Sequence, residues 1–359
     1  MNIQKSTREF EQWLALYTEI VPADITYKHE QMKTGAFPFL RATFYRWAQE
    51  WTKINADVAK APIVLAVGDL HVENFGTWRD AEGRLIWGVN DFDEAGHMPY
   101  TSDLVRLATS AHLAIQDKHL CVECVQAGEA ILNGYVAGLK AGGQPFVLAE
   151  EHPELSGIAG ASLRNPAAYW KKLDDLPREK GPVLESAIVA LEEALPDKGL
   201  PYTLKRRVAG LGNLGKPRYV ALAKMNGGHI AREVKALVPS ASVWAQGSFE
   251  TAPEIFYQAI VGRSVRSPDP FVRLSGHWIV RRLGPDCSRI EISSLGDERA
   301  EMRLLHSMGW ETANIHLGSR ASIDAIRKDL KSRKAGWLSA AAEQMVRATE
   351  ADWTQWASG

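Results

Sequence analysis

The chain has 359 residues, of which 42 are basic and 43 acidic, so its formal net charge is only −1. Such a balance gives no global attraction to nucleic acid or to acidic membrane surfaces. No apolar run approaches the roughly 20 residues that span a bilayer, and Met1–Lys5 leads into charged residues without an apolar signal core. We therefore expect a cytoplasmic protein without a membrane or nucleic-acid partner. At about 150 residues per domain, the length allows two lobes.

The first 60 residues predict helices. Glu9–Ile20 has apolar residues at helical spacing, and Phe37–Leu40 indicates a turn that leads into an amphipathic helix carrying Phe44 and Trp47. Neither piece contains a glycine-rich loop that could cover a nucleotide. We expect residues 1–60 to pack as a helical segment on a larger body.

Two short polar segments follow, and together they are the most informative part of the chain. The first is Gly68–Phe75, in which Asp69 and Asn74 are five positions apart. Phosphoryl transfer needs a carboxylate that orients the attacking hydroxyl and, five positions later in the kinase pattern, an amide oxygen that binds a metal ion. Asp69 and Asn74 satisfy this spacing.

The second polar segment is Asn90–Glu94, which follows the apolar run Leu85–Val89. The run predicts a strand that carries Asp91 to the same place, as a ligand for the Mg²⁺ that bridges phosphates. Asp93 lies two residues further on and is a second candidate metal ligand. Asp, Asn and Gly also cluster in ordinary surface turns, so the prediction depends on the joint spacing of the two segments.

The stretch from Val64 to Ala108 resembles the catalytic and metal loops of small-molecule kinases of the aminoglycoside and choline phosphotransferase type. Those enzymes carry Gly-Asp-x-His-x-x-Asn, then Asp-Phe-Asp or Asp-Trp-Glu, and then a further Asp-Leu, which Asp103 and Leu104 match here. The whole chain is similar to a bacterial family of unknown function that is grouped with the protein-kinase-like fold. Its members share the phrases GDxHxxNFG and DFDE.

The resemblance implies a role for each matched position. Asp69 would be the catalytic base, and Asn74 and Asp91 would be metal ligands. His71, which we place with Asp69 among the catalytic residues, would brace the loop together with Asp103. The implied cofactors are ATP and Mg²⁺.

Helices are predicted between the two loops and the next motif. Residues 101–115 and 122–139 have helical apolar spacing, and residues 162–199 predict a polar helical stretch that would close the catalytic lobe in this resemblance. Cys121 and Cys124 form Cys-x-x-Cys, but no second pair or histidine cluster completes a zinc site. We expect these cysteines to serve in packing.

A glycine-rich stretch lies far downstream, at Gly210, Gly212 and Gly215, and precedes a β-rich run that ends in Lys224. The pattern Gly-x-Gly-x-x-Gly also marks dinucleotide-binding folds, which require a helix directly after the last glycine. Here Lys216–Arg218 and the strand-forming residues that follow favour a hairpin. The glycines are then expected to cover the phosphates of a nucleotide.

Lys224 and Glu233 are predicted to complete the nucleotide site. In a kinase, a strand lysine contacts the phosphate oxygens and a helical glutamate holds that lysine in place. Ile230–Leu237 predicts such a helix, with Glu233 on it. Two alternatives remain open for Glu233, a surface charge on a helix and the acidic residue of a dinucleotide fold about twenty positions after the glycines.

Further elements are predicted towards the C-terminus. Trp278–Leu283 and Ser288–Ile292 indicate two strands joined by a turn, which would supply the rest of the sheet and the hinge that contacts adenine. Residues 322–358 have helical apolar spacing, and Trp353 and Trp356 are placed for helix packing.

Together these elements predict an α+β protein with a protein-kinase-like two-lobed fold in circularly permuted order. We expect a helical segment at 1–60, a catalytic lobe at 61–199, a nucleotide-binding β lobe at 200–300, and helices at 301–359 that return to the catalytic lobe. Permutation is physically reasonable because the termini of a domain often lie close together at its surface.

The expected function is ATP-dependent transfer of a phosphoryl group to a hydroxyl of a small-molecule acceptor. Two alternatives use the same fold, namely adenylyl transfer with the nucleotide inverted in the cleft, and a pseudokinase that binds nucleotide for regulation. The base, metal and lysine positions are all occupied, which favours an active enzyme. No motif identifies the acceptor, and analogy of fold supports only a reaction class.

Overall fold

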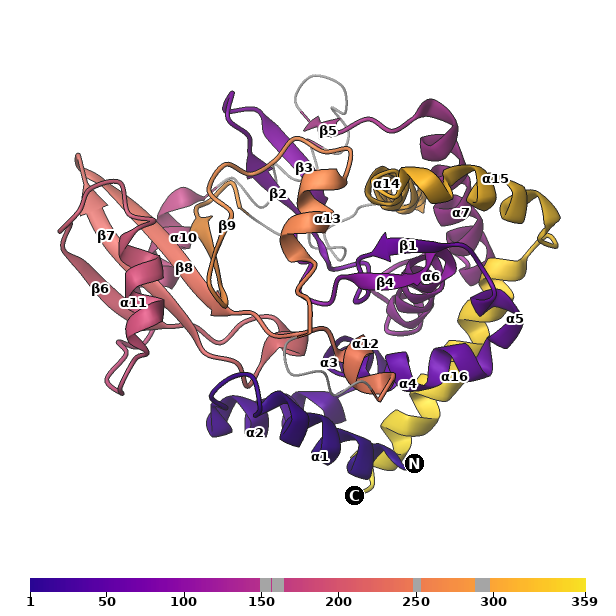
Figure 1. Cartoon of the computed structure of the whole chain (residues 1–359), viewed down its shortest axis with the longest axis horizontal. Coiled ribbons are helices and arrows are strands. Elements are labelled where there is room, and N and C mark those ends of the chain that lie inside the picture. Colours follow the sequence, from indigo (N-terminus) through magenta and orange to yellow (C-terminus); the bar gives the residue numbers. More distant parts are fainter. Residues whose placement is uncertain (149–155, 157–164, 248–252, 288–297) are drawn as a thin grey trace.

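The computed structural model describes residues 1–148, 156, 165–247, 253–287 and 298–359, and the protein combines helices with antiparallel sheets (Figure 1). The described helices are α1 (Ile3–Leu14), α2 (Pro22–Lys33), α3 (Ala36–Ala42), α4 (Phe44–Ile54), α5 (Ala56–Ala59), α6 (Tyr100–Gln116), α7 (Cys124–Ala141), α10 (Pro166–Asp174), α11 (Glu185–Glu192), α12 (Ala241–Ala245), α13 (Tyr257–Arg263), α14 (Glu298–His316), α15 (Ile323–Ser332) and α16 (Trp337–Ala357).

The strands form three sheets. A two-stranded sheet pairs β1 with β4, a three-stranded sheet has the order β2-β3-β5, and a five-stranded sheet has the order β6-β7-β8-β10-β9, all with antiparallel neighbours. The strands are β1 (Ile63–Ala66), β2 (Phe75–Arg79), β3 (Leu85–Val89), β4 (Gly96–Pro99), β5 (Phe146–Val147), β6 (Tyr202–Arg206), β7 (Arg218–Met225), β8 (Gly228–Ala236), β9 (Arg273–Ser275) and β10 (Trp278–Leu283).

One helix packs on each face of the five-stranded sheet. Because side chains alternate between the two faces of a strand, alternate residues of β7 contact different helices. On β7, Tyr219 and Ala221 share a buried cluster with α11, whereas Val220 and Leu222 share another with Leu173 of α10. Figure 1 shows this sheet with α10 and α11 at the left, apart from the larger helical body. The expectation that residues 162–199 close the catalytic lobe is wrong for α10 and α11, which pack on the sheet instead.

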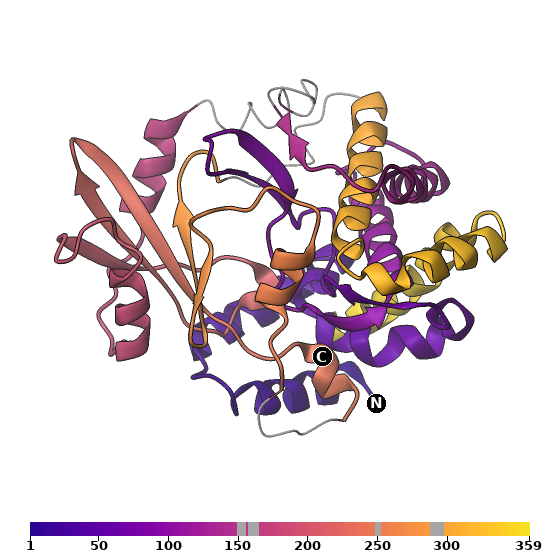
Figure 2. The same ribbon diagram turned by 45° about the horizontal axis from the view of Figure 1, so that its top comes forward.

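The helical body depends on a close crossing of α7 and α14, which lie side by side in Figures 1 and 2. A Cβ atom added to Gly134 of α7 would lie 1.8 Å from the carbonyl oxygen of His306, and one added to Gly309 of α14 would lie 1.9 Å from that of Ile131. The two backbones therefore touch at glycines, which allow an approach that no larger residue permits.

Replacing Gly134 with Ala is expected to destabilise the protein by about 3 kcal/mol, because the new methyl group overlaps a carbonyl oxygen that is held in a helix. Urea denaturation measures the change in the free energy of unfolding. Gly262→Ala is the matched control, since Gly262 also lies in a helix and a Cβ there would meet nothing within 4 Å. Equal stability of the two variants would contradict the close crossing.

The two ends of the chain pack together. The Ile3 amide nitrogen lies 3.4 Å from Oε1 of Gln355, and Gln4 Nε2 donates to the Gln355 carbonyl at 2.9 Å. Arg46 of α4 forms an ion pair of 2.7 Å with Asp352 of α16. The first and last helices therefore belong to one body (Figure 1).

Several sequence expectations are confirmed. The helices expected at 101–115 and 122–139 are α6 and α7, and the strands expected at 85–89 and 278–283 are β3 and β10. The helix expected at 322–358 is two helices, α15 and α16, because the chain turns at Gly336 with φ +73°. The strand expected at 288–292 lies outside the described residues. Within the described part of the chain, no helix is both long and apolar enough to cross a membrane.

Candidate active site

The loop that carries Asp69 is held by the buried carboxylate of Asp103, on α6. The backbone amides of Val67 and Gly68 donate to this carboxylate at 2.7 and 2.9 Å, and His316 Nε2 of α14 lies 3.0 Å from it. Asp103 and His316 are fully buried. Asp103 thus braces the loop, which is the role that the sequence resemblance implied for it.

Asp69 contacts an arginine that the sequence did not predict. Arg106 Nε donates to Asp69 Oδ1 at 2.9 Å, and the Arg106 guanidinium also donates to the Leu40 carbonyl of α3 at 2.9 Å. Burial raises the pKa of Asp69, and the charge of Arg106 opposes this rise. Arg106 lies three residues after Asp103, so both project from the same side of α6 towards the loop.

Asn74 joins the two polar loops through its side-chain amide. Its Nδ2 donates to the backbone carbonyls of Asp69 and Asp91, each at 3.1 Å. The Asn74 amide nitrogen donates to the His71 carbonyl at 2.8 Å, and His71 Nδ1 accepts from the Glu73 amide at 3.2 Å. The five-residue spacing therefore corresponds to a tight turn that sets Asp69 and Asn74 beside Asp91.

Asp91 and Asp93 contact lysines from β8 and from the loop that precedes β7. The Lys235 ammonium lies 3.4 Å from Asp91 and 2.7 Å from Asp93, and Lys216 lies 3.8 Å from Asp93. Burial alone would raise the pKa of Asp91, but Lys235 holds it well below its usual range, whereas burial and the charge of Asp91 raise the pKa of Asp93.

The glycine-rich stretch is the connection of a hairpin, as the sequence predicted. Strands β6 and β7 pair from Tyr202 with Ala223 to Arg206 with Tyr219, and the loop between them returns to the helical body. Gly210 and Gly215 have φ angles of +74° and +98°, which favour glycine. The hairpin, with no helix directly after the glycines, does not fit the dinucleotide alternative.

The glycine loop lies beside the carboxylates of Asp69 and Asp91. A Cβ atom on Gly212 would lie 3.3 Å from Asp69 Oδ2, and Asn213 Nδ2 donates to Asp91 Oδ2 at 3.1 Å. The Gly215 carbonyl accepts from the Val21 amide at 2.9 Å at the start of α2. Three segments far apart in the sequence therefore meet at one point.

Glu233 lies in strand β8, and the prediction of a helix over residues 230–237 is wrong. The residues have fair helix propensity, but β8 pairs with β7 on one side and with β10 on the other, and tertiary pairing overrides propensity. Glu233 faces Arg281 across β8 and β10, and it is fully buried.

Glu233 is surrounded by arginines. Arg281 Nε donates to it at 2.7 Å, Arg207 forms a second ion pair, and Arg218 lies 3.7 Å away. Burial would raise the pKa of Glu233, but these arginines hold it well below its usual range. We call Arg207, Arg218 and Arg281 the arginine cluster. It has more positive charge than the one glutamate balances.

Lys224 does not reach the site. It is exposed near the outer end of β7, where it pairs with His229, while Arg218 at the inner end of the same strand pairs with Lys235. Six residues of strand correspond to about 20 Å. The expected pairing of Lys224 with Glu233 is therefore wrong, and Lys235 is the strand lysine that meets the carboxylates. It lies two residues after Glu233, on the same face of β8.

One cleft of about 610 Å³ lies among these elements, and Glu233 and Lys235 are buried and are not among its lining residues. Its lining includes the two carboxylate loops, the glycine loop from Arg207 to Asn213, and the arginine cluster. On the helical side it also includes residues of α1, α2, α3 and α4, and on the sheet side residues of α10 and β10. Of the residues predicted from sequence, Asp69, His71, Asn74, Asp91, Asp93, Gly210 and Gly212 line the cleft.

The residues present fit Mg²⁺ bound together with phosphates. Among the described residues there is no group of three or more His, Cys, Asp or Glu side chains that could hold a metal by themselves. Mg²⁺, however, is commonly held by one or two carboxylates, with substrate phosphates and waters supplying the other ligands. The carboxylate of Asp91 and the side-chain oxygen of Asn74 are suitable donors on adjoining loops.

The fold and the cleft define an α+β protein in which a glycine-rich hairpin of an antiparallel sheet meets two carboxylate loops of a helical body. Residues 20–151 match the model of a family described as an uncharacterized protein conserved in bacteria (DUF2252). The matched region contains both carboxylate loops and ends before the five-stranded sheet. No curated protein matches the chain, and no solved structure does.

Proposed function

We propose that the protein is an ATP-dependent phosphotransferase, with kinase-like lobes in circularly permuted order, that uses Mg²⁺ to phosphorylate a hydroxyl of a small molecule. The observation that carries the proposal is the position of the glycine loop beside both carboxylates, with Gly212 close to Asp69 and Asn213 hydrogen-bonded to Asp91. Phosphoryl transfer requires little covalent chemistry from a protein, so a site must mainly position and neutralise charged groups. This cleft brings such groups together.

The sheet side of the cleft offers cations to a polyphosphate. Arg207, Arg218 and Arg281 share a single buried glutamate, and Lys235 lies next to them on the same face of the sheet. Guanidinium groups bind phosphate oxygens in paired hydrogen bonds. The backbone amides of the glycine loop would contact the same phosphates. We therefore assign the phosphate-binding role to the arginine cluster and Lys235 in place of Lys224.

The helical side offers the base. Asp69 accepts a proton from the attacking hydroxyl as the hydroxyl oxygen bonds to the γ-phosphorus and the bond from that phosphorus to the departing ADP oxygen breaks. Arg106 holds the carboxylate in position. Because burial raises the pKa of Asp69, the carboxylate is a better proton acceptor than an exposed aspartate. Asn74 and Asp91 would hold Mg²⁺, which when bound would neutralise charge on the phosphate oxygens.

The order of the blocks supports a permutation. Both carboxylate loops precede the sheet in sequence, and the C-terminal helix α16 returns to pack near α1 through Gln355. Joining the adjacent ends and opening the chain before the sheet would give the order of a conventional kinase, with the glycine loop first.

Product analysis tests the proposal. Purified protein incubated with Mg·ATP and no added acceptor is expected to release ADP slowly, because water then accepts the phosphoryl group. EDTA is expected to abolish the release, because the phosphates then lack Mg²⁺. Chromatography of the nucleotides distinguishes the outcomes. AMP with pyrophosphate would indicate adenylyl transfer, and bound ATP without any product would indicate a pseudokinase.

A further inference from the structure

Lys28, on α2, is a buried cation that forms no direct ion pair with any described residue. Lys28 is 3% exposed. Its ammonium also has no hydrogen-bond acceptor among the described residues. It lies 5.7 Å from the centroid of the Tyr45 ring. Burial of an unpaired charge is costly, and here it lowers the pKa of Lys28 to about 8. A buried titratable group with a shifted pKa in a cleft is a candidate for a functional role.

The position of Lys28 distinguishes it from the phosphate-binding groups. Lys28 lines the cleft, and the carboxylates whose charge opposes the fall of its pKa are Glu11 first, then Glu94 and Asp69. Asp91, in contrast, is dominated by Lys235 and Arg281 on the sheet side. Lys28 is carried by α2, which with the Asp69 loop lines the helical side of the cleft, where an acceptor must approach.

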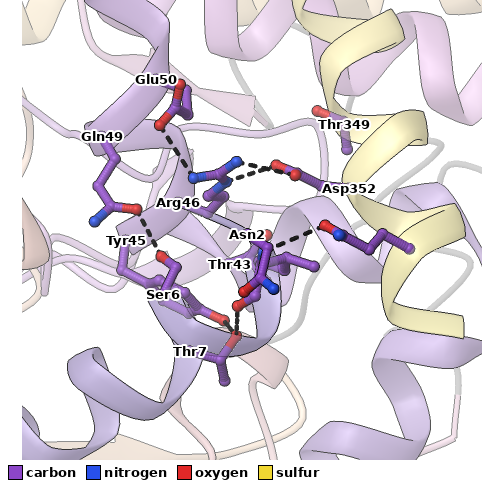
Figure 3. Close-up of polar contacts among 12 residues, drawn as sticks. Asn2, Ser6, Thr7, Thr43, Tyr45, Arg46, Gln49, Glu50, Thr349 and Asp352 are labelled. Carbon is purple, nitrogen blue, oxygen red and sulfur yellow. Dashed lines mark hydrogen bonds and ion pairs between the residues drawn. The ribbon is translucent and has the colours of Figure 1, made fainter. Parts of the chain in front are cut away.

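The wall beside Lys28 is aromatic and rigid. Phe10 of α1 stacks on Tyr45 of α4 with ring centroids 4.4 Å apart, and Trp244 packs edge-on against Phe10 at 5.4 Å. The Tyr45 hydroxyl lies 2.8 Å from Thr7 Oγ1, a contact that Figure 3 shows within the polar network of the first helices. Phe10 and Tyr45 both line the cleft, so this wall offers a fixed apolar surface.

We propose that Lys28 binds the anionic group, a carboxylate or a phosphate monoester, of a small hydroxyl-bearing acceptor whose apolar part lies on Phe10 and Tyr45. This inference rests on the proposed function, because it places the acceptor hydroxyl at Asp69. A lysine ammonium supplies three hydrogen-bond donors and no acceptor, so an anion satisfies it where a neutral alcohol leaves its charge unbalanced. The cleft of about 610 Å³ must also hold the nucleotide, which limits the acceptor to a small molecule.

Titration calorimetry with matched probes tests the assignment. The anionic probes are 3-phenyllactate and benzyl phosphate, and their neutral counterparts are 3-phenyllactamide and benzyl alcohol. The full-length protein is titrated alone and with Mg²⁺ and a non-hydrolysable ATP analogue. We expect at least one anionic probe to bind at least tenfold more tightly than its counterpart. The two pairs show whether a carboxylate or a phosphate monoester is the preferred group.

Two variants assign the preference to Lys28. Lys28→Met is expected to abolish it without weakening binding of the ATP analogue, whereas Lys33→Met, at an exposed lysine of the same helix, should leave it unchanged. Wild type without an anion preference, or a preference that survives in Lys28→Met, would overturn the inference. Weaker analogue binding in Lys28→Met would show that Lys28 holds the nucleotide and would overturn it too. Absence of analogue binding in wild type would refute the proposed function. The titration without nucleotide measures the anion preference separately, so the two failures can be distinguished.

Discussion

Replacing Asp69 with Asn is expected to reduce Mg-dependent release of ADP from ATP by about 10³-fold, because loss of a general base typically costs 10² to 10⁴ in rate. Asn keeps the shape and one oxygen that can accept from Arg106, so the loop should keep its conformation. Binding of Mg·ATP is expected to change little, since the phosphate-binding cations lie on the sheet side of the cleft.

The measurement is steady-state ADP release, with thermal unfolding recorded for each variant to confirm a folded protein at the assay temperature. Asp57→Asn is the control, because Asp57 is an exposed aspartate that pairs with the exposed Lys60. Turnover in Asp69→Asn equal to that of the control would remove Asp69 from the mechanism.

Replacing Glu233 with Ala is expected to cost about 3 to 5 kcal/mol of stability, the usual loss when one partner of a buried ion pair is removed. The reason is local, because Arg207, Arg218 and Arg281 would be left around an apolar methyl group. Arg218 is itself buried, so removing the carboxylate would leave a buried guanidinium without its ion-pair partner. Urea denaturation measures the loss.

Two further variants interpret that result. Glu233→Gln keeps the shape and one acceptor oxygen and is expected to lose less stability than Glu233→Ala. Glu343→Ala removes an exposed pair with Arg347 on α16 and should cost under about 0.5 kcal/mol. If Glu233→Ala were as stable as Glu343→Ala, the arginine cluster would not depend on its central carboxylate.

The carboxylate loops could be predicted from sequence because their geometry is local. Asp69 and Asn74 are joined by one tight turn, and Asp91 directly follows a short strand, so spacing along the chain corresponds to distance in space. The glycine hairpin was predictable for the same reason, since Lys216–Arg218 and a β-rich run follow its last glycine.

The positions of Glu233 and Lys235 could not be predicted, because strand register decides which face of the sheet they occupy. Helix propensity alone favours a helix around Glu233, and only pairing with β7 and β10 places Glu233 and Lys235 on the face that meets the carboxylates. Lys224 looked equivalent in sequence, yet it lies at the opposite end of its strand. Arg106 had a detectable signal, its spacing of three residues from Asp103 on one helix.

The thermal shift produced by Mg·ATP tests the central claim most directly, measured for wild type, Lys235→Ala and Lys224→Ala, each against its own ligand-free midpoint. At a concentration about one hundred times the dissociation constant, binding should add roughly 2.7 kcal/mol. We predict the full shift in wild type and Lys224→Ala and a weakened shift in Lys235→Ala, because Lys235 contacts the carboxylates and Lys224 lies at the far end of β7. No shift in wild type, or a shift lost in Lys224→Ala and kept in Lys235→Ala, would contradict a nucleotide site in this cleft.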